Sequence, residues 1–245
     1  MDYKLCVSVV NYFYHGDTES QRKQRENHVK KCIILANGKP PKKSIITFFQ
    51  KKGYNKLICA DGGSNSALKM GLIPYAIIGD LDSITPESLK RFKSISKIIR
   101  LNRQNDTDVE KCLKYAVKNK FDEALLVGVT GNRLDHTFCN LGIVLKFFPS
   151  INISLVAEDS FLKPYKGNTK LKTYSGETIS IYGLNSKTKI TSKGLKYKLN
   201  NVALPFGEKE STSNVATGSE VELNITSGPV FVIRDVNLMM KYDLF

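Results

Sequence analysis

Two aspartates separated by one residue follow a short apolar run in the segment IIGDLDSITPE, residues 77–87. Asp80 and Asp82 come directly after a predicted buried strand that ends at Gly79. In an extended chain, side chains two residues apart point the same way, so we expect both carboxylates on one side. Such a pair repels unless a cation lies between the two groups. Oxygen ligands of this kind suit Mg²⁺, which usually keeps waters and substrate phosphates in its coordination shell.

Helix capping is the alternative interpretation of these acids. Asp82 or Ser83 would be an ordinary N-cap for a helix in ITPESLKRF, residues 84–92, and Ser83 suits that role. Capping does not explain Asp80.

A second acid pair with the same spacing, Asp106 and Asp108, occurs in NDTDVEK, residues 105–111. This segment also resembles a helix start, with Asp106 or Thr107 as the cap and Glu110 as a capping-box partner. The metal-binding and capping interpretations of this segment both stay open.

Two further segments place polar residues where an apolar run ends. In ADGGSN, residues 60–65, Asp61 and two glycines precede a helix that Ser64 would cap. Glycine lets a backbone approach a ligand closely, and a helix N-terminus offers N–H groups to a phosphate. In GVTGNRLDHTFCN, residues 128–140, Arg133 can bind phosphate oxygens with its forked guanidinium group. The role of His136 stays open between a ligand, a proton carrier and a helix-surface residue.

These segments need elements that bring them together, and the chain between residue 31 and about residue 159 supplies a suitable pattern. Short apolar runs alternate with helical patterns, which predicts an α/β domain with a mostly parallel sheet. The predicted strands are 31–37, 56–61, 75–80, 97–102, 123–129 and 152–158, and the predicted helices include 42–53, 107–120 and 134–148. Ligands of such sheets bind at the carboxyl ends of the strands, which is where these acids, glycines and arginine fall.

After about residue 160 the pattern becomes strand-like and no helical pattern is evident. We therefore predict an α/β domain in residues 1–160 and a smaller all-β domain in residues 161–245. Pro164 and Gly167 are the expected breakers between the two domains. The role of residues 1–30 is left open.

Taken together, the four segments predict a Mg²⁺-dependent enzyme that acts on a phosphorylated nucleotide. The chain has no G-x-x-x-x-G-K-[ST] segment, so it is not a P-loop enzyme. It also has no G-x-G-x-x-G with a ribose-binding acid, which argues against a dinucleotide-dependent dehydrogenase.

The composition limits the choice of partners and compartment. The net charge of +14 would attract polyanions, but the lysines are spread along the 245 residues and no nucleic-acid-binding motif is present. We therefore expect no nucleic-acid or membrane partner. The five cysteines are scattered and form no C-x-x-C pair, which argues against a disulfide framework and a zinc site. With no signal-peptide pattern and no membrane-spanning stretch, a cytoplasmic protein is expected.

The motifs CADGGSN, IIGDLDS, NDTDVEK and GNRLDH, in this order and spacing, resemble the thiamine pyrophosphokinase family. The resemblance extends to residues 191–214, where TSKGLKYKL and ESTSN are similar to that family's thiamine-binding region. It covers roughly residues 31–235.

The resemblance implies a Rossmann-like α/β catalytic domain, a C-terminal β-sandwich and a homodimer with thiamine near the subunit interface. The implied reaction transfers a pyrophosphoryl group from ATP to the thiamine hydroxyl and releases AMP. The implied metal ligands and catalytic residues are Asp80, Asp82 and Asp108, with Arg133 on phosphate oxygens. The implied nucleotide-binding residues are Asp61, Gly62, Gly63, Asn65, Thr107, Arg133 and Asp135. The implied thiamine-binding residues are Tyr197, Ser211, Ser213 and Asn214.

The chain departs from the family pattern at two positions. Asn105 stands where an acid is often found, so a contribution of Asn105 or Asp106 to the metal site is left open. Tyr197 stands where relatives often have tryptophan, although tyrosine can also stack on an aromatic ring. The general base, Asp80 or Asp108, is also left open. The competing interpretations are a pyrophosphokinase or nucleotidyltransferase with another alcohol acceptor, and a basic nucleic-acid-binding protein.

Overall fold

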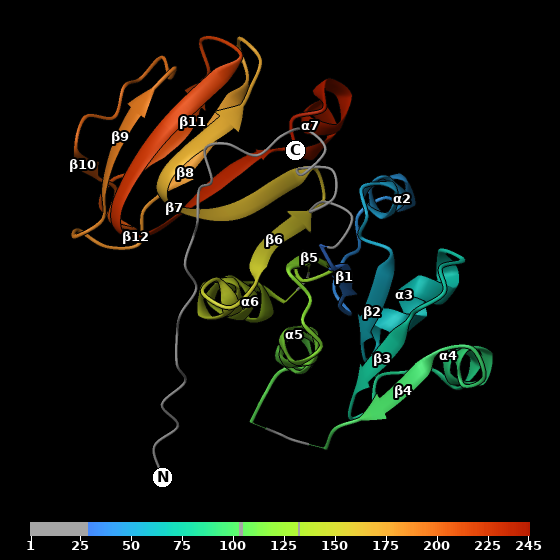
Figure 1. Ribbon diagram of the computed structural model, residues 1–245. Helices are drawn as coiled ribbons and strands as arrows, with labels where there is room; N and C mark the ends of the chain where they lie inside the picture. Colours follow the sequence, from blue (N-terminus) through green and yellow to red (C-terminus); the bar gives the residue numbers. More distant parts are fainter. Residues whose placement is uncertain (1–28, 103–104, 132) are drawn as a thin grey trace.

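The computed structural model describes residues 29–102, 105–131 and 133–245, so the open question about the first 28 residues lies outside it. Six parallel strands form the first part of the sheet, in the order β6-β5-β1-β2-β3-β4 (Figure 1). They are β1 (Lys31–Leu35), β2 (Lys56–Ala60), β3 (Ala76–Gly79), β4 (Lys97–Arg100), β5 (Glu123–Val127) and β6 (Asn152–Ala157). All six strands predicted from the sequence for this region are confirmed, as is the parallel sheet.

The strands of this sheet are almost wholly apolar because both faces are covered. Ile34, Ile58 and Ile78 pack in one core with α5 and α6, whereas Ile33 and Ile77 pack in the other with α2, α3 and α4. Figure 1 shows the two groups of helices on opposite sides of the strands. The helices are α2 (Lys43–Lys51), α3 (Gly63–Lys69), α4 (Pro86–Phe92), α5 (Asp108–Lys118), α6 (Leu134–Phe147) and α7 (Val236–Tyr242).

The helix starts differ in part from the sequence predictions. Thr107 caps α5, and Glu110 completes a reciprocal capping box, so this prediction is confirmed. The predicted cap of α4 was wrong, because Thr85 and not Asp82 or Ser83 accepts the hydrogen bond from the Ser88 N–H. Helix α3 begins at Gly63 without a side-chain cap, since the hydroxyl of Ser64 donates to the carbonyl of Asp61.

The second part of the chain is rich in β-strands and continues the same sheet. Strand β7 pairs with β6 and, over most of its length, with β12. The strands are β7 (Ser160–Lys172), β8 (Thr178–Tyr182), β9 (Lys189–Lys193), β10 (Val202–Ala203), β11 (Ser211–Val215) and β12 (Glu220–Asp235). Pro164 and Gly167 were expected to interrupt the chain, but both lie within β7.

The expectation of an all-β C-terminal region was wrong at one element, helix α7. Asp235 caps this helix by accepting a hydrogen bond from the Leu238 N–H, and Val236 and Met239 pack into the same core as α2. The helix has only seven residues, which is too short to give a clear helical pattern.

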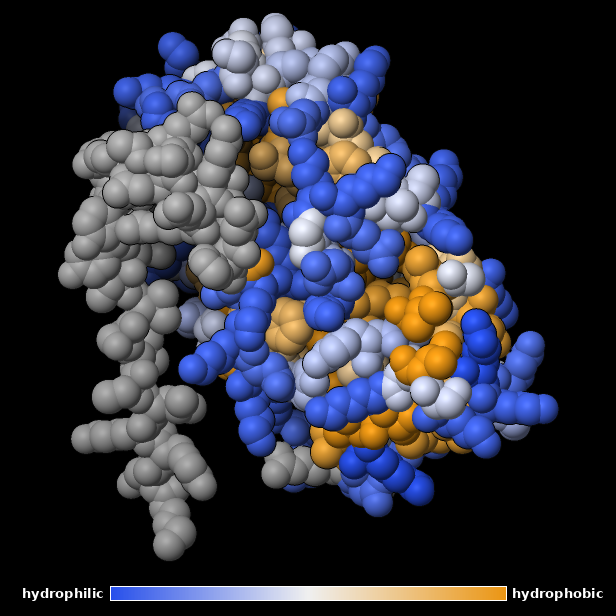
Figure 2. Space-filling model, turned by 45° about the vertical axis from the view of Figure 1, so that its right-hand side comes forward, coloured by the Kyte–Doolittle hydropathy of each residue, from blue (hydrophilic) through white to orange (hydrophobic). Residues whose placement is uncertain are grey.

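The face shown in Figure 2 is mostly hydrophilic, with apolar side chains gathered mainly at its lower right. No helix in the described part of the chain is long and apolar enough to cross a membrane.

Candidate active site

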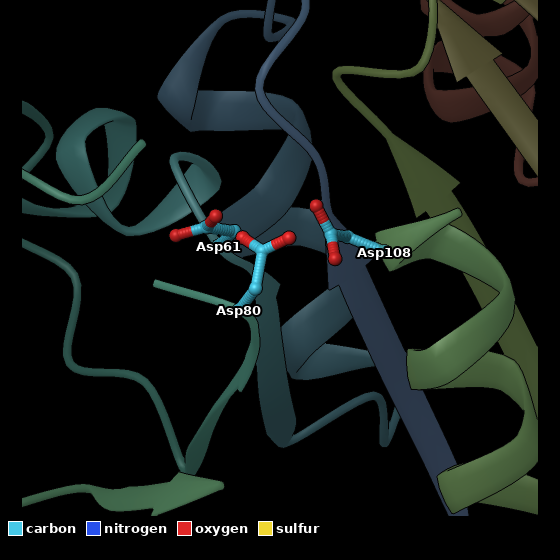
Figure 3. A group of neighbouring side chains, drawn as sticks. All are labelled: Asp61, Asp80 and Asp108. Carbon is cyan, nitrogen blue, oxygen red and sulfur yellow. The ribbon is translucent and has the colours of Figure 1, made fainter. Parts of the chain in front are cut away.

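Three carboxylates converge at the carboxyl ends of the parallel strands. Asp61 follows β2, Asp80 follows β3, and Asp108 is the first residue of α5. One oxygen from each lies within 4.8 Å of the others (Figure 3). The topology brings Asp61 and Asp80 together, because β2 and β3 are neighbours and their carboxyl ends lie at the same edge of the sheet. The three acids thus form a cluster, called here the acid cluster.

Asp61 is the most buried member of the acid cluster, with only 1% of its surface exposed. Its Oδ2 accepts a 3.3 Å hydrogen bond from the Ser83 N–H, but its buried Oδ1 has no partner among the described residues. Burial raises the pKa of Asp61 to about 6, with a further contribution from the charge of Asp108, while the Ser83 hydrogen bond opposes the rise. A buried carboxylate oxygen without a donor is costly, and a bound cation removes that cost. The oxygen donors of this cluster therefore fit a divalent metal ion.

Lys111 supplies a buried positive charge to the acid cluster. It is 4% exposed, and its Nζ lies 2.8 Å from Asp108 Oδ1 and 4.0 Å from Asp80 Oδ2. Burial lowers the pKa of Lys111, but the hydrogen bond to Asp108 and the neighbouring carboxylates outweigh burial and raise it above its ordinary value. One ammonium group does not balance three carboxylates, so the cluster keeps a negative excess when all three are ionised.

Lys111 was not among the site residues predicted from the sequence. Its position was nevertheless visible, because it lies three residues after Asp108 in a predicted helix and therefore on the same face.

Asp82 is not one of the three converging acids. Leu81 has a φ of +67°, so the segment is not extended and the expected alternation of Asp80 and Asp82 was wrong. The Asp82 side chain is exposed and accepts a 2.8 Å hydrogen bond from the Ser83 hydroxyl. The Asp82 N–H donates to Asp80 Oδ1, which is the main cause of the lowered pKa of Asp80. A metal-binding role for Asp82 stays a prediction.

A cavity of about 1050 Å³ opens beside the acid cluster. Its wall includes the three acids and Lys111, and it also includes Gly62, Thr107, Arg133 and His136. The loops after β1 and β5 complete it with Asn37, Gly38 and Thr130, and Asn140 lines it from α6. These four residues were not selected from the sequence, although Gly38 and Thr130 directly follow predicted strands, Asn37 ends one and Asn140 lies in a predicted helix. The Gly38 N–H joins the two loops by a 2.7 Å hydrogen bond to the Gly128 carbonyl.

The two glycines after Asp61 allow close packing of α3 against β1. A Cβ at Gly63 would lie 2.1 Å from the Leu35 carbonyl oxygen, and one at Gly62 would lie 2.5 Å from the Asn37 amide. Gly62 lines the cavity, whereas Gly63 is not among its lining residues. Packing against the backbone therefore requires glycine at Gly63, whereas a Cβ at Gly62 would meet only the movable end of the Asn37 side chain. Phosphate binding by this turn stays a prediction.

Of the other predicted nucleotide-binding residues, some line the cavity and others do not. Arg133 lines the cavity, and its guanidinium makes two hydrogen bonds, of 2.9 and 2.6 Å, to the carboxylate of Asp135. The paired arginine holds the pKa of the Asp135 carboxyl well below its usual range. Thr107 lines the cavity while its hydroxyl caps α5, whereas Asn65 is absent from the lining and bonds to the loop before α4.

Two family models match the chain. The one described as "Thiamin pyrophosphokinase, catalytic domain" matches residues 49–155, and "Thiamin pyrophosphokinase, vitamin B1 binding domain" matches residues 168–230. Thiamin pyrophosphokinase 1 of Caenorhabditis elegans is 30% identical over 230 residues, which span 86% of this chain and 92% of that relative. The chain belongs to the thiamin pyrophosphokinase family.

Solved structures agree with this membership in the thiamin pyrophosphokinase family. Thiamine pyrophosphokinase from Bacillus subtilis has a TM-score of 0.70 and 25% identity, covering 84% of this chain and 99% of that one. Thiamin pyrophosphokinase from Candida albicans has a TM-score of 0.73, covering 84% and 89% of the two chains, and at 20% identity it supports the fold alone.

The residues predicted to bind thiamine gather in the family's B1-binding region. The Asn214 amide on β11 bonds to both backbone groups of Tyr197, at 3.0 and 2.7 Å, and to the Ser211 hydroxyl at 3.0 Å. Asn214 is buried, and its amide holds the backbone of Tyr197 in place. Tyr197 itself is 61% exposed. Ser213 lies on the same strand with a φ of +54°. None of these four residues lines the cavity beside the acid cluster.

Proposed function

We propose that the chain transfers the pyrophosphoryl group of ATP to the hydroxyl group of thiamine, giving thiamine diphosphate and AMP. Membership in the thiamin pyrophosphokinase family supports this reaction. The single observation that carries the proposal is the acid cluster at the wall of a cavity large enough for a nucleotide, with a buried Asp61 oxygen that no described residue hydrogen-bonds.

Asp61, Asp80 and Asp108 would hold a Mg²⁺ ion, because each offers a carboxylate oxygen toward the same point. When bound, the ion supplies positive charge that offsets the charge of the triphosphate and of the transition state. This proposal replaces Asp82 with Asp61 in the ligand set and keeps Asp82 as a residue of the adjoining loop.

The side chains around the acid cluster supply the remaining chemistry. Lys111 holds Asp108 in place and offers its ammonium group to phosphate oxygens at the cavity wall. Arg133 binds a second phosphate oxygen, and Asp135 orients its guanidinium plane. The thiamine hydroxyl loses its proton to a carboxylate of the cluster, Asp80 or Asp108.

Tyr197, Ser211, Ser213 and Asn214 form the proposed thiamine site. Because the described residues that line the cavity all come from the 36–140 part of the chain, we propose a homodimer in which the cavity of one subunit faces the thiamine site of its partner. Mixed subunits test this arrangement. Chains with Asp80→Asn and chains with Tyr197→Ala, each impaired alone, should regain activity when mixed, whereas a site built within one chain predicts no gain.

We also propose a cytoplasmic location. The four cysteines among the described residues are free thiols and three are buried, which suits a reducing compartment.

Product analysis tests the reaction. The purified full chain is incubated with ATP, Mg²⁺ and thiamine, and the products are separated by HPLC. We expect AMP and thiamine diphosphate in equal amounts, with neither product when thiamine is omitted and almost none with Asp80→Asn. Turnover of another alcohol in place of thiamine would show that the scaffold serves a different acceptor, and ADP in place of AMP would contradict pyrophosphoryl transfer.

A further inference from the structure

The loop between β3 and α4, residues 80–85, carries one ligand of the proposed metal site and lacks regular structure. Its turn passes through the left-handed residue Leu81. Such a segment keeps the Asp80 carboxylate close to Asp61 and Asp108 only if other groups hold the segment, because an unrestrained loop samples many conformations.

Asn65 makes three hydrogen bonds to this loop. Its Nδ2 donates to the Ser83 carbonyl at 2.8 Å. Its Oδ1 accepts from the Thr85 N–H at 3.0 Å and from the Thr85 hydroxyl at 3.1 Å. Both ends of the side-chain amide are therefore engaged, and Asn65 is absent from the cavity wall, whereas Ser83 and Asp80 are part of it.

The same loop is tied to the acid cluster itself. The Ser83 N–H donates to Asp61, and its carbonyl accepts from Asn65, so one residue links the buried acid to α3. Thr85 also caps α4, so the bonds from Asn65 fix the point where that helix begins. Movement of this loop would change the separation of Asp61 and Asp80.

We propose that Asn65 is a positioning residue that holds the 80–85 loop so that Asp80 and Asp61 bind one divalent metal ion. This inference rests on the proposed metal site and replaces the expectation that Asn65 binds the nucleotide directly. Residues that orient metal ligands in this way typically change metal affinity or activity by about 10- to 100-fold when they are removed.

The test is Mn²⁺ binding by the full chain without nucleotide, measured from the electron paramagnetic resonance signal of free Mn²⁺. Asn65→Ala should raise the Mn²⁺ dissociation constant by about 10- to 100-fold. Ser66→Ala, on the next residue of α3, is the matched control and should bind Mn²⁺ as the wild type does. Equal binding by Asn65→Ala and wild type, or no binding by the wild type, would overturn the proposal.

A second pair of variants tests the hydrogen bonds between Asn65 and the 80–85 loop by changing a loop residue, Thr85. Thr85→Ala removes a hydroxyl that donates to Asn65, whereas Thr85→Ser keeps it. Thr85→Ala should weaken Mn²⁺ binding and Thr85→Ser should restore it. This pair decides the matter if Asn65→Ala does not fold, and equal Mn²⁺ binding by the two Thr85 variants would count against the proposal.

Kinetics separate positioning from direct nucleotide contact. Positioning predicts that Asn65→Ala needs more Mg²⁺ to reach half its maximal rate, with an unchanged KM for ATP at saturating Mg²⁺. Direct contact predicts a raised KM for ATP at saturating Mg²⁺ with unchanged Mn²⁺ binding. If the wild type makes no thiamine diphosphate but Asn65→Ala still weakens Mn²⁺ binding, the proposed reaction fails and the positioning role stands.

Discussion

Asp61→Asn should make the metal-free protein more stable while it removes activity. The replacement has the same shape, and asparagine tolerates the φ of +42° found at this position. Its side-chain oxygen can still accept the hydrogen bond from the Ser83 N–H. The change therefore removes mainly one negative charge from a group that is 1% exposed and has an oxygen without a hydrogen-bond partner in the described part of the chain.

The magnitude follows from the raised pKa of Asp61. A rise from 3.8 to about 6 corresponds to about 3 kcal/mol, since one pKa unit is worth about 1.4 kcal/mol. Below pH 3.8 the carboxyl is protonated in both the folded and unfolded states and costs nothing. Above about pH 6 it is ionised in both states, and the folded state bears the full cost. The free energy of unfolding of the wild type thus falls by about 3 kcal/mol as the pH rises from 3.8 through about 6.

The assay is thermal unfolding in EDTA, followed by circular dichroism between pH 4 and pH 8. For a chain of this size, about 3 kcal/mol corresponds to a rise in Tm of roughly 6–12 °C. We expect Asp61→Asn to melt above the wild type at pH 8, with the difference shrinking toward pH 4. Asp82→Asn, an exposed acid of the neighbouring loop, is the control and should show no such trend.

Two results would refute this reasoning. A difference in Tm that does not change with pH would mean that the ionisation of Asp61 is not its cause. A lower Tm for Asp61→Asn at pH 8 would mean that the carboxylate stabilises the metal-free fold.

Three further variants test the other parts of the site. Lys111→Met should act oppositely to Asp61→Asn and lower stability in EDTA by about 1–3 kcal/mol, because the partly buried Asp108 carboxylate loses the ammonium group that donates to it; an unchanged melting curve would contradict this. Asp80→Asn should weaken Mn²⁺ binding far more than Asp82→Asn, and the reverse order would return Asp82 to the ligand set. Tyr197→Ala should raise the KM for thiamine by about 10-fold through lost ring contact and leave the KM for ATP unchanged; steady-state kinetics would expose the opposite pattern.

The parallel sheet could be predicted from sequence because its strands are buried on both faces. Such strands are continuous apolar runs, and the helices between them bring their carboxyl ends to one edge. This reasoning places Asp61, Asp80 and Asp108 near one another without any knowledge of distances. The capping box at Thr107 was also predictable, since its residues are only three positions apart.

What the sequence could not provide depends on local geometry and on contacts between distant segments. The left-handed Leu81 turns Asp82 out of the acid cluster. A leucine in the sequence does not indicate such a turn, because leucine rarely adopts a positive φ. The hydrogen bonds from Asn65 to Ser83 and Thr85 join segments about twenty residues apart, so they become visible only in the fold. Helix α7 was missed because it is short and is stabilised by burial in a core that it shares with the distant helix α2.

The central claim is that the acid cluster directs transfer of both terminal phosphoryl groups of ATP to thiamine. The most direct test uses ATP labelled with ³²P at the β-phosphorus, incubated with Mg²⁺, thiamine and the full chain. We expect the label in thiamine diphosphate and none in AMP, and Asp80→Asn should leave it in ATP. Label retained in ADP would contradict the account, because it would mean that only the γ-phosphoryl group had moved.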